Sequence, residues 1–84
     1  MPRADDVEDQ TRKARKHLAT NLIVMRREKG WSQEDLALEA GLHRTFVAHV
    51  ERGARNISLD NIERLAGVLG VETYELLVPF SGEK

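Results

Sequence analysis

The chain of 84 residues contains no cysteine, which excludes disulfide bridges, thiolate zinc sites and cysteine nucleophiles. No apolar run approaches 18 residues, and the first ten residues, MPRADDVEDQ, lack the apolar core of a signal peptide. Aromatic residues make up only 5% of the chain, whereas charged residues reach 32%. These features predict a small, soluble, cytoplasmic protein with a thin hydrophobic core.

The sequence offers no arrangement for catalysis or for metal binding. No nucleophile is placed beside a base, and no glycine-rich phosphate loop is present. The three histidines, His17, His43 and His49, lack the i, i+4 spacing of a helical metal site. We therefore expect neither an enzyme nor a bound cofactor.

The formal net charge of -1 conceals a strong segregation of charge along the chain. Residues 11–30 carry seven Lys or Arg against one Glu, whereas residues 1–10 and 57–84 are acidic. Local fields decide whether a surface binds phosphates, so a basic face can coexist with acidic ends. The basic cluster Arg12, Lys13, Arg15 and Lys16 is interpreted either as a solvated helix face or as an anchor on DNA phosphates.

The stretch from Gln33 to Arg52 has the pattern of two short helices joined by a tight turn. Its buried positions are predicted to be Leu36, Ala37, Leu42, Val47 and Val50. Ala37 lies where the helices cross and must be small, and Gly41 follows the last helical residue, where a left-handed backbone is usual. The pattern favours a helix-turn-helix over an ordinary helical hairpin within an unrelated bundle.

The fold class expected from the whole chain is all-α, with five helices in one compact domain. The helices are predicted at about residues 11–29, 33–40, 44–52, 59–69 and 73–78. Ser32 with Asp35, Ser58 and Thr73 are the predicted N-terminal caps. We expect a disordered or frayed arm at residues 1–11, the helix-turn-helix domain at 12–80 and a tail at 81–84.

Side chains on the outer face of the predicted helix at 44–52 are candidates for reading DNA bases. Arg44 can donate two hydrogen bonds to guanine, Thr45 can contact thymine, and His49 can donate to a base or a phosphate. His43 is expected to be the N-cap and to lie near the DNA backbone.

The chain leaves this helix through a polar loop. There Arg52, Arg55 and Asn56 are either phosphate contacts or solvated loop residues.

The C-terminal apolar residues exceed what a small monomer needs. Tyr74, Leu77, Val78 and Phe80 suggest a homodimer seam, although they could instead close the core of the monomer. Ile23 and Val24 lie off the apolar stripe of the first predicted helix. They indicate either a wider buried face on this helix, which we favour, or an exposed patch that contacts a partner.

The segments REKGWSQEDLALEAGL, VERG and SLDNIERLAGVLGV resemble the helix-turn-helix family of the Cro and lambda-repressor type, also called the Xre family. The resemblance covers about residues 18–78. Within it, GLHRTFVAHVERGARNISLDNIERLAGVLGV is similar to the controller proteins of restriction-modification systems, with Phe46 where those proteins often have Tyr.

The resemblance implies a homodimer that binds double-stranded DNA at an inverted-repeat operator and regulates transcription, including that of its own gene. It implies that Gln33 bonds the DNA backbone, that Arg26 forms a structural ion pair with Glu51, and that bound protein can block RNA polymerase or present a surface to it. The alternative is an antitoxin-like or co-activator module that uses the same fold to bind a protein, which the acidic N-terminus and the Ile23 and Val24 patch would serve.

Overall fold

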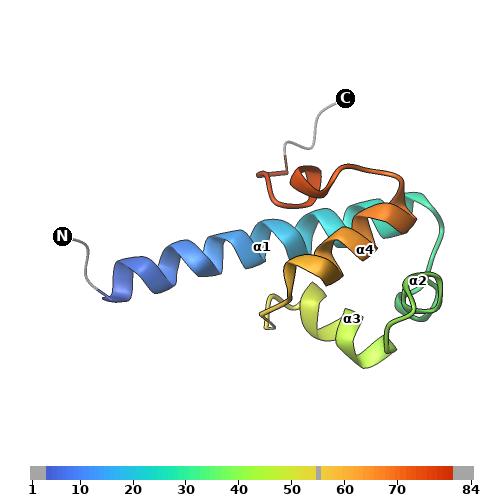
Figure 1. The fold of residues 1–84 in the computed structure, drawn as a ribbon, viewed down its shortest axis with the longest axis horizontal. Helices are drawn as coiled ribbons and strands as arrows, with labels where there is room; N and C mark the ends of the chain where they lie inside the picture. Colours follow the sequence, from blue (N-terminus) through green and yellow to red (C-terminus); the bar gives the residue numbers. More distant parts are fainter. Residues whose placement is uncertain (1–3, 55, 81–84) are drawn as a thin grey trace.

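The computed structural model describes residues 4–54 and 56–80, with side chains described from Lys13 onward. This part of the chain is all-helical, as predicted. Its elements are α1 (Ala4–Glu28), α2 (Gln33–Ala40), α3 (Arg44–Glu51), α4 (Leu59–Leu69) and the 3-10 helix η1 (Thr73–Leu76). The long helix α1 runs through the middle of the molecule, with α2 and α3 below it and η1 above it (Figure 1).

Helix α1 begins at Ala4, seven residues earlier than predicted, so the expected disordered arm is helical over most of its length. The sequence from Ala4 to Gln10 contains no glycine or proline and carries four acids. Acidic residues near a helix N-terminus are stabilised by the helix macrodipole, a factor that the prediction of disorder overlooked. The predicted tail at 81–84 lies outside the described residues.

The predicted fifth α-helix is instead the short 3-10 helix η1, so the described chain has four α-helices. A segment this short before Pro79 forms too few hydrogen bonds to stabilise an α-helix. Glu72, not Thr73, is its N-cap, and the Glu72 backbone N–H donates to the Glu75 carboxylate at 2.8 Å. Asn21 of α1 anchors this segment by donating to the carbonyl oxygens of Leu76 and Val78, at 3.0 and 2.7 Å.

The predicted ends of α2 and the start of α4 are confirmed. Ser32 and Asp35 form a reciprocal capping box, in which the Ser32 hydroxyl accepts from the Asp35 N–H at 3.0 Å and the Asp35 carboxylate accepts from the Ser32 N–H at 2.9 Å. The Ser58 hydroxyl accepts from the Asn61 N–H in the same manner. Gly41 ends α2 with a φ of +69°, a left-handed conformation in which a Cβ is strained.

A single core joins all of these elements. Its largest fully buried side chains are Leu22, Leu36, Val47, Val50, Leu65 and Leu76. Leu59 is apolar but 65% exposed, because it is the first residue of α4 and the core face begins one turn later at Ile62. Ile23 and Val24 are half-buried and lie outside the core cluster, so the wider face expected on α1 forms only in part.

Candidate nucleic-acid interface

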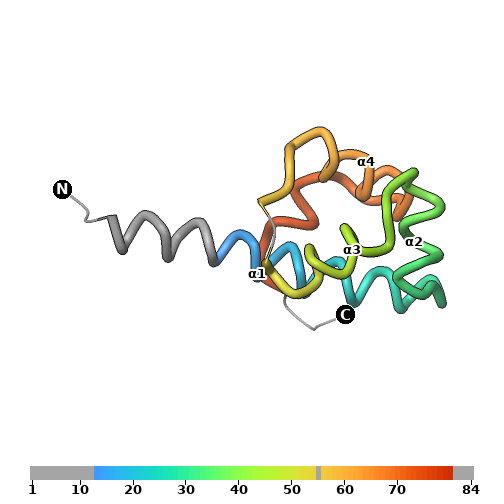
Figure 2. The backbone as a smooth tube through the Cα atoms, turned by 90° about the horizontal axis from the view of Figure 1, so that it is seen from below, coloured from blue at the N-terminus to red at the C-terminus, as the bar shows by residue number. Residues whose placement is uncertain are grey.

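The helix-turn-helix predicted from the sequence is formed by α2, the turn at 41–43 and α3. The Leu42 N–H donates to the Ala37 carbonyl oxygen at 2.8 Å and closes the turn, while the half-buried Leu42 side chain packs on the core. Ala37 is only 3% exposed where the two helices meet, so no larger side chain would fit without separating them. Seen from below, α3 lies on the near face of the molecule with α2 next to it (Figure 2).

The two sides of α3 have opposite environments. Val47 and Val50 are fully buried beneath the helix, whereas Arg44 and Thr45 at its start are exposed. His49 was expected on the outer face but is half-buried. The first turn of α3 is therefore the part best placed to enter a DNA groove.

His43 occupies the N-cap position of α3, as predicted, with extended backbone angles. Its imidazole makes no capping hydrogen bond and is exposed. The ring is therefore available to a partner outside the protein.

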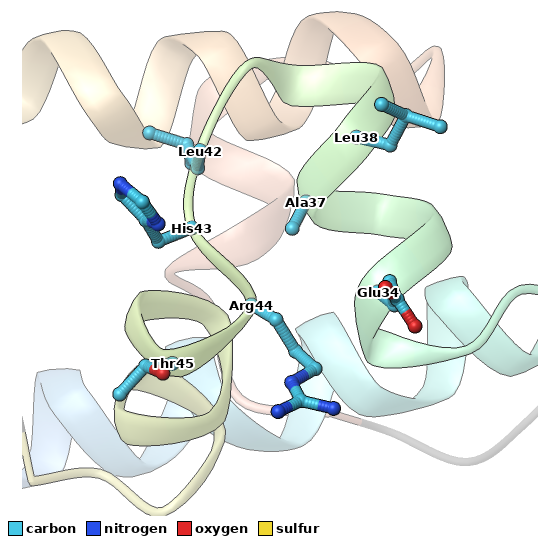
Figure 3. Close-up of a pocket in the computed structure, with 7 residues that line it drawn as sticks. All are labelled: Glu34, Ala37, Leu38, Leu42, His43, Arg44 and Thr45. Carbon is cyan, nitrogen blue, oxygen red and sulfur yellow. The ribbon is translucent and has the colours of Figure 1, made fainter.

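A hollow of about 450 Å³ lies between α2 and the start of α3 (Figure 3). Its lining residues are Glu34, Ala37, Leu38, Leu42, His43, Arg44 and Thr45. Three of them, His43, Arg44 and Thr45, are candidate DNA contacts from the sequence. Glu34 and the 78% exposed Leu38 have no sequence signal for DNA binding, because an acid and an apolar side chain are neither cations nor hydrogen-bond donors.

A buried ion pair fastens the end of α3 to α1. The Arg26 Nε donates to Glu51 Oε2 at 2.6 Å, and Arg26 Nη2 donates to Glu51 Oε1 at 3.0 Å. Arg26 Nη1 also donates to the Trp31 carbonyl oxygen at 2.7 Å, so one guanidinium holds both α3 and the turn between α1 and α2. Hydrogen bonding to Glu51 raises the pKa of Arg26 above its ordinary value, against the opposing effect of burial.

Gln33, the first residue of α2, also bonds this carboxylate. Its Nε2 donates to Glu51 Oε1 at 2.9 Å, and its side chain is half-buried. The two residues are 18 positions apart, and nothing in the sequence signalled their contact. Glu51 thus joins α1, α2 and α3, which fixes the arrangement of the helix-turn-helix on the body of the protein.

The candidate phosphate contacts lie at the exit of α3. Arg52 and Asn56 are exposed, whereas Arg55 lies outside the described residues. Asn56 lines a second cavity of about 220 Å³ together with Arg15 of α1. The Arg15 Nε is buried there without a hydrogen-bond partner in the described part of the chain.

The predicted dimer residues divide into two groups. Tyr74, Val78 and Phe80 are 65%, 44% and 48% exposed, which is unusual for large apolar side chains that lie close together in sequence. Leu77 is half-buried and packs against the core, so it serves the monomer at least in part.

Among the described residues, no group of three or more acidic, histidine or cysteine side chains could hold a metal ion. No described helix has both the length and the apolar character needed to cross a membrane.

The fold and this site are those of a helix-turn-helix protein, and the chain belongs to the helix-turn-helix family HTH_3, whose model matches residues 22–76. The chain is 55% identical, over 62 residues, to a hypothetical transcription factor of Neisseria meningitidis serogroup B. That match covers 74% of this chain but only 58% of the relative, so the chain spans little more than half of that protein.

Two solved structures show the same fold. The restriction-modification controller protein C.AhdI from Aeromonas hydrophila has a TM-score of 0.71 and 47% identity, covering 74% of this chain and 94% of that one. The biofilm regulator SinR, solved in complex with DNA, has a TM-score of 0.69 and 31% identity, covering 73% of this chain and 98% of its own. The resemblance to the Xre family and its controller proteins is therefore confirmed.

Proposed function

We propose that this protein is a sequence-specific DNA-binding regulator of transcription that acts as a homodimer on an inverted-repeat operator. The observation that carries the proposal is α3, whose buried valines fix it to the core while Arg44 and Thr45 project from its first turn. A transcription factor, a restriction-modification controller and a regulator solved with DNA are all similar to this chain, which supports the same conclusion.

The proposed mechanism depends on the position of α3. In a symmetric dimer, two copies of α3 separated by about 34 Å enter successive major grooves. Arg44 then donates to guanine, Thr45 contacts thymine, and the half-buried His49 donates to a base or a phosphate. Gln33, His43, Arg52, Arg55 and Asn56 are the proposed contacts to the DNA backbone, which hold the helix in register.

Similarity to C.AhdI supports a more specific role as the controller protein of a restriction-modification system. Such a regulator acts in the prokaryotic cytoplasm on its own promoter. Bound protein either blocks RNA polymerase or presents a surface to it.

The proposed dimer seam consists of Tyr74, Val78 and Phe80. Val78→Asp is expected to convert dimers to monomers, because a carboxylate would be desolvated at an apolar contact. Sedimentation velocity at micromolar concentrations measures this change. Leu38→Asp is the matched control, since Leu38 is also an exposed apolar residue but lies on α2.

The fold of Val78→Asp should be retained, because Val78 is already 44% exposed in the monomer. A thermal melt of each variant checks this. A Val78→Asp variant that remains as dimeric as the wild type would place the seam elsewhere.

Binding to random-sequence duplex DNA tests the proposed function at its simplest level. Fluorescence anisotropy with a labelled duplex should show a Kd of about 10⁻⁴ to 10⁻⁶ M near physiological salt, with affinity falling steeply as salt rises. A protein that binds no duplex even at low salt would favour the protein-interaction module instead.

A further inference from the structure

The hollow between α2 and α3 contains a negative charge on the surface proposed to face DNA. Glu34, the second residue of α2, and Arg44, the first residue of α3, both line it and are both exposed. The Arg44 side chain extends from the start of α3 towards the part of the hollow that Glu34 lines (Figure 3). Within the described chain, the side chains of Glu34 and Arg44 form no hydrogen bond or ion pair with each other or with another group, so both charges remain open to a bound ligand.

Glu34 lies in the first turn of α2, where the helix macrodipole stabilises an acid, but on a surface proposed to face DNA its charge also repels phosphates. An arginine can bind either of two DNA groups: a phosphate, which is present at every position, or the O6 and N7 atoms of guanine, which depend on sequence. Phosphate is an anion, whereas the guanine edge is uncharged. A carboxylate in the same hollow as the guanidinium therefore disfavours the phosphate contact more than the guanine contact.

We infer that Glu34 is a specificity-determining residue that acts through Arg44, by disfavouring phosphate as a partner of this guanidinium. Arg44 is then directed to guanine, and binding to DNA of arbitrary sequence is weakened. This inference rests on the proposed DNA-binding function.

Glu34→Gln tests the inference because it removes the charge and keeps the size of the side chain. Affinity for a random duplex should rise about two- to fivefold, in the range measured for exposed opposite charges, and affinity for the operator should rise less. The ratio of the affinity for the operator to the affinity for the random duplex therefore falls. Glu39→Gln is the matched control, because Glu39 is an exposed acid of the same helix that does not line the hollow, and it should leave this ratio unchanged.

The role of Arg44 is tested by repeating Glu34→Gln in an Arg44→Ala background. The change in the affinity ratio should then disappear, because the guanidinium through which Glu34 acts is absent. The inference is overturned if Glu34→Gln and Glu39→Gln change the ratio equally, or if the effect of Glu34→Gln persists without Arg44. A wild-type protein that binds neither duplex would instead overturn the proposed function.

Discussion

Replacing Glu51 with Ala should lower the free energy of unfolding by about 3–5 kcal/mol, because it leaves the Arg26 guanidinium buried without its carboxylate partner. Arg26 as a residue is only 8% exposed, and Gln33 loses its acceptor at the same time. For a domain of this size, the melting temperature should fall by about 12 °C or more. Thermal unfolding followed by circular dichroism measures the change.

Glu63→Ala is the control for this prediction. Glu63 is an exposed acid of α4, so its loss should change the free energy of unfolding by no more than about 0.5 kcal/mol. If the two variants melt at the same temperature, the ion pair does not hold α3 in place.

Replacing Arg44 with Ala should weaken binding to the operator by about 1–3 kcal/mol, the usual value of a bidentate contact to guanine. Affinity for a random duplex should change little, because Glu34 already disfavours the phosphate contact of this side chain. Titration of both duplexes at one salt concentration gives the two values. The fold should be unaffected, since Arg44 is exposed.

Arg64→Ala removes the same charge from α4, an element that carries none of the proposed base contacts, although the Arg64 guanidinium reaches the turn at Gly41. It should reduce affinity for both duplexes slightly and by the same factor. Equal losses on both duplexes for Arg44→Ala as well would show that Arg44 does not read bases.

The helix-turn-helix could be predicted from sequence because its constraints are local. Gly41 must adopt a positive φ, Ala37 must be small, and Ser32 with Asp35 must cap α2. Each of these requirements is met by only a few residue types at a fixed position. Such requirements arise within a few residues of one another. A single sequence therefore displays them clearly.

The ends of the fold were predicted less well, because two effects compete there. The acids and low hydrophobicity of the first ten residues favoured disorder, whereas the same acids suit the N-terminus of a helix, and α1 begins at Ala4. At the other end, apolar spacing favoured an α-helix, but the short segment forms a 3-10 helix held by Asn21.

The site was predicted only in part, because its geometry depends on contacts between distant residues. The role of Glu51 followed from family resemblance alone, since an acid at the end of a DNA-reading helix has no local explanation. Its bond to Gln33 and the presence of Glu34 in the same hollow as Arg44 required the packed structure. Sequence patterns for DNA contacts consist of cations and hydrogen-bond donors, so they do not indicate an acid such as Glu34.

Selection from a random duplex library tests the central claim most directly. Purified protein is incubated with the library near physiological salt, and the retained duplexes are sequenced. We predict recovery of an inverted repeat whose half-sites are centred about one helical turn apart, with a guanine in each half-site where Arg44 lies. Retention without sequence preference, or no retention, would contradict the proposal of a dimeric operator-binding regulator.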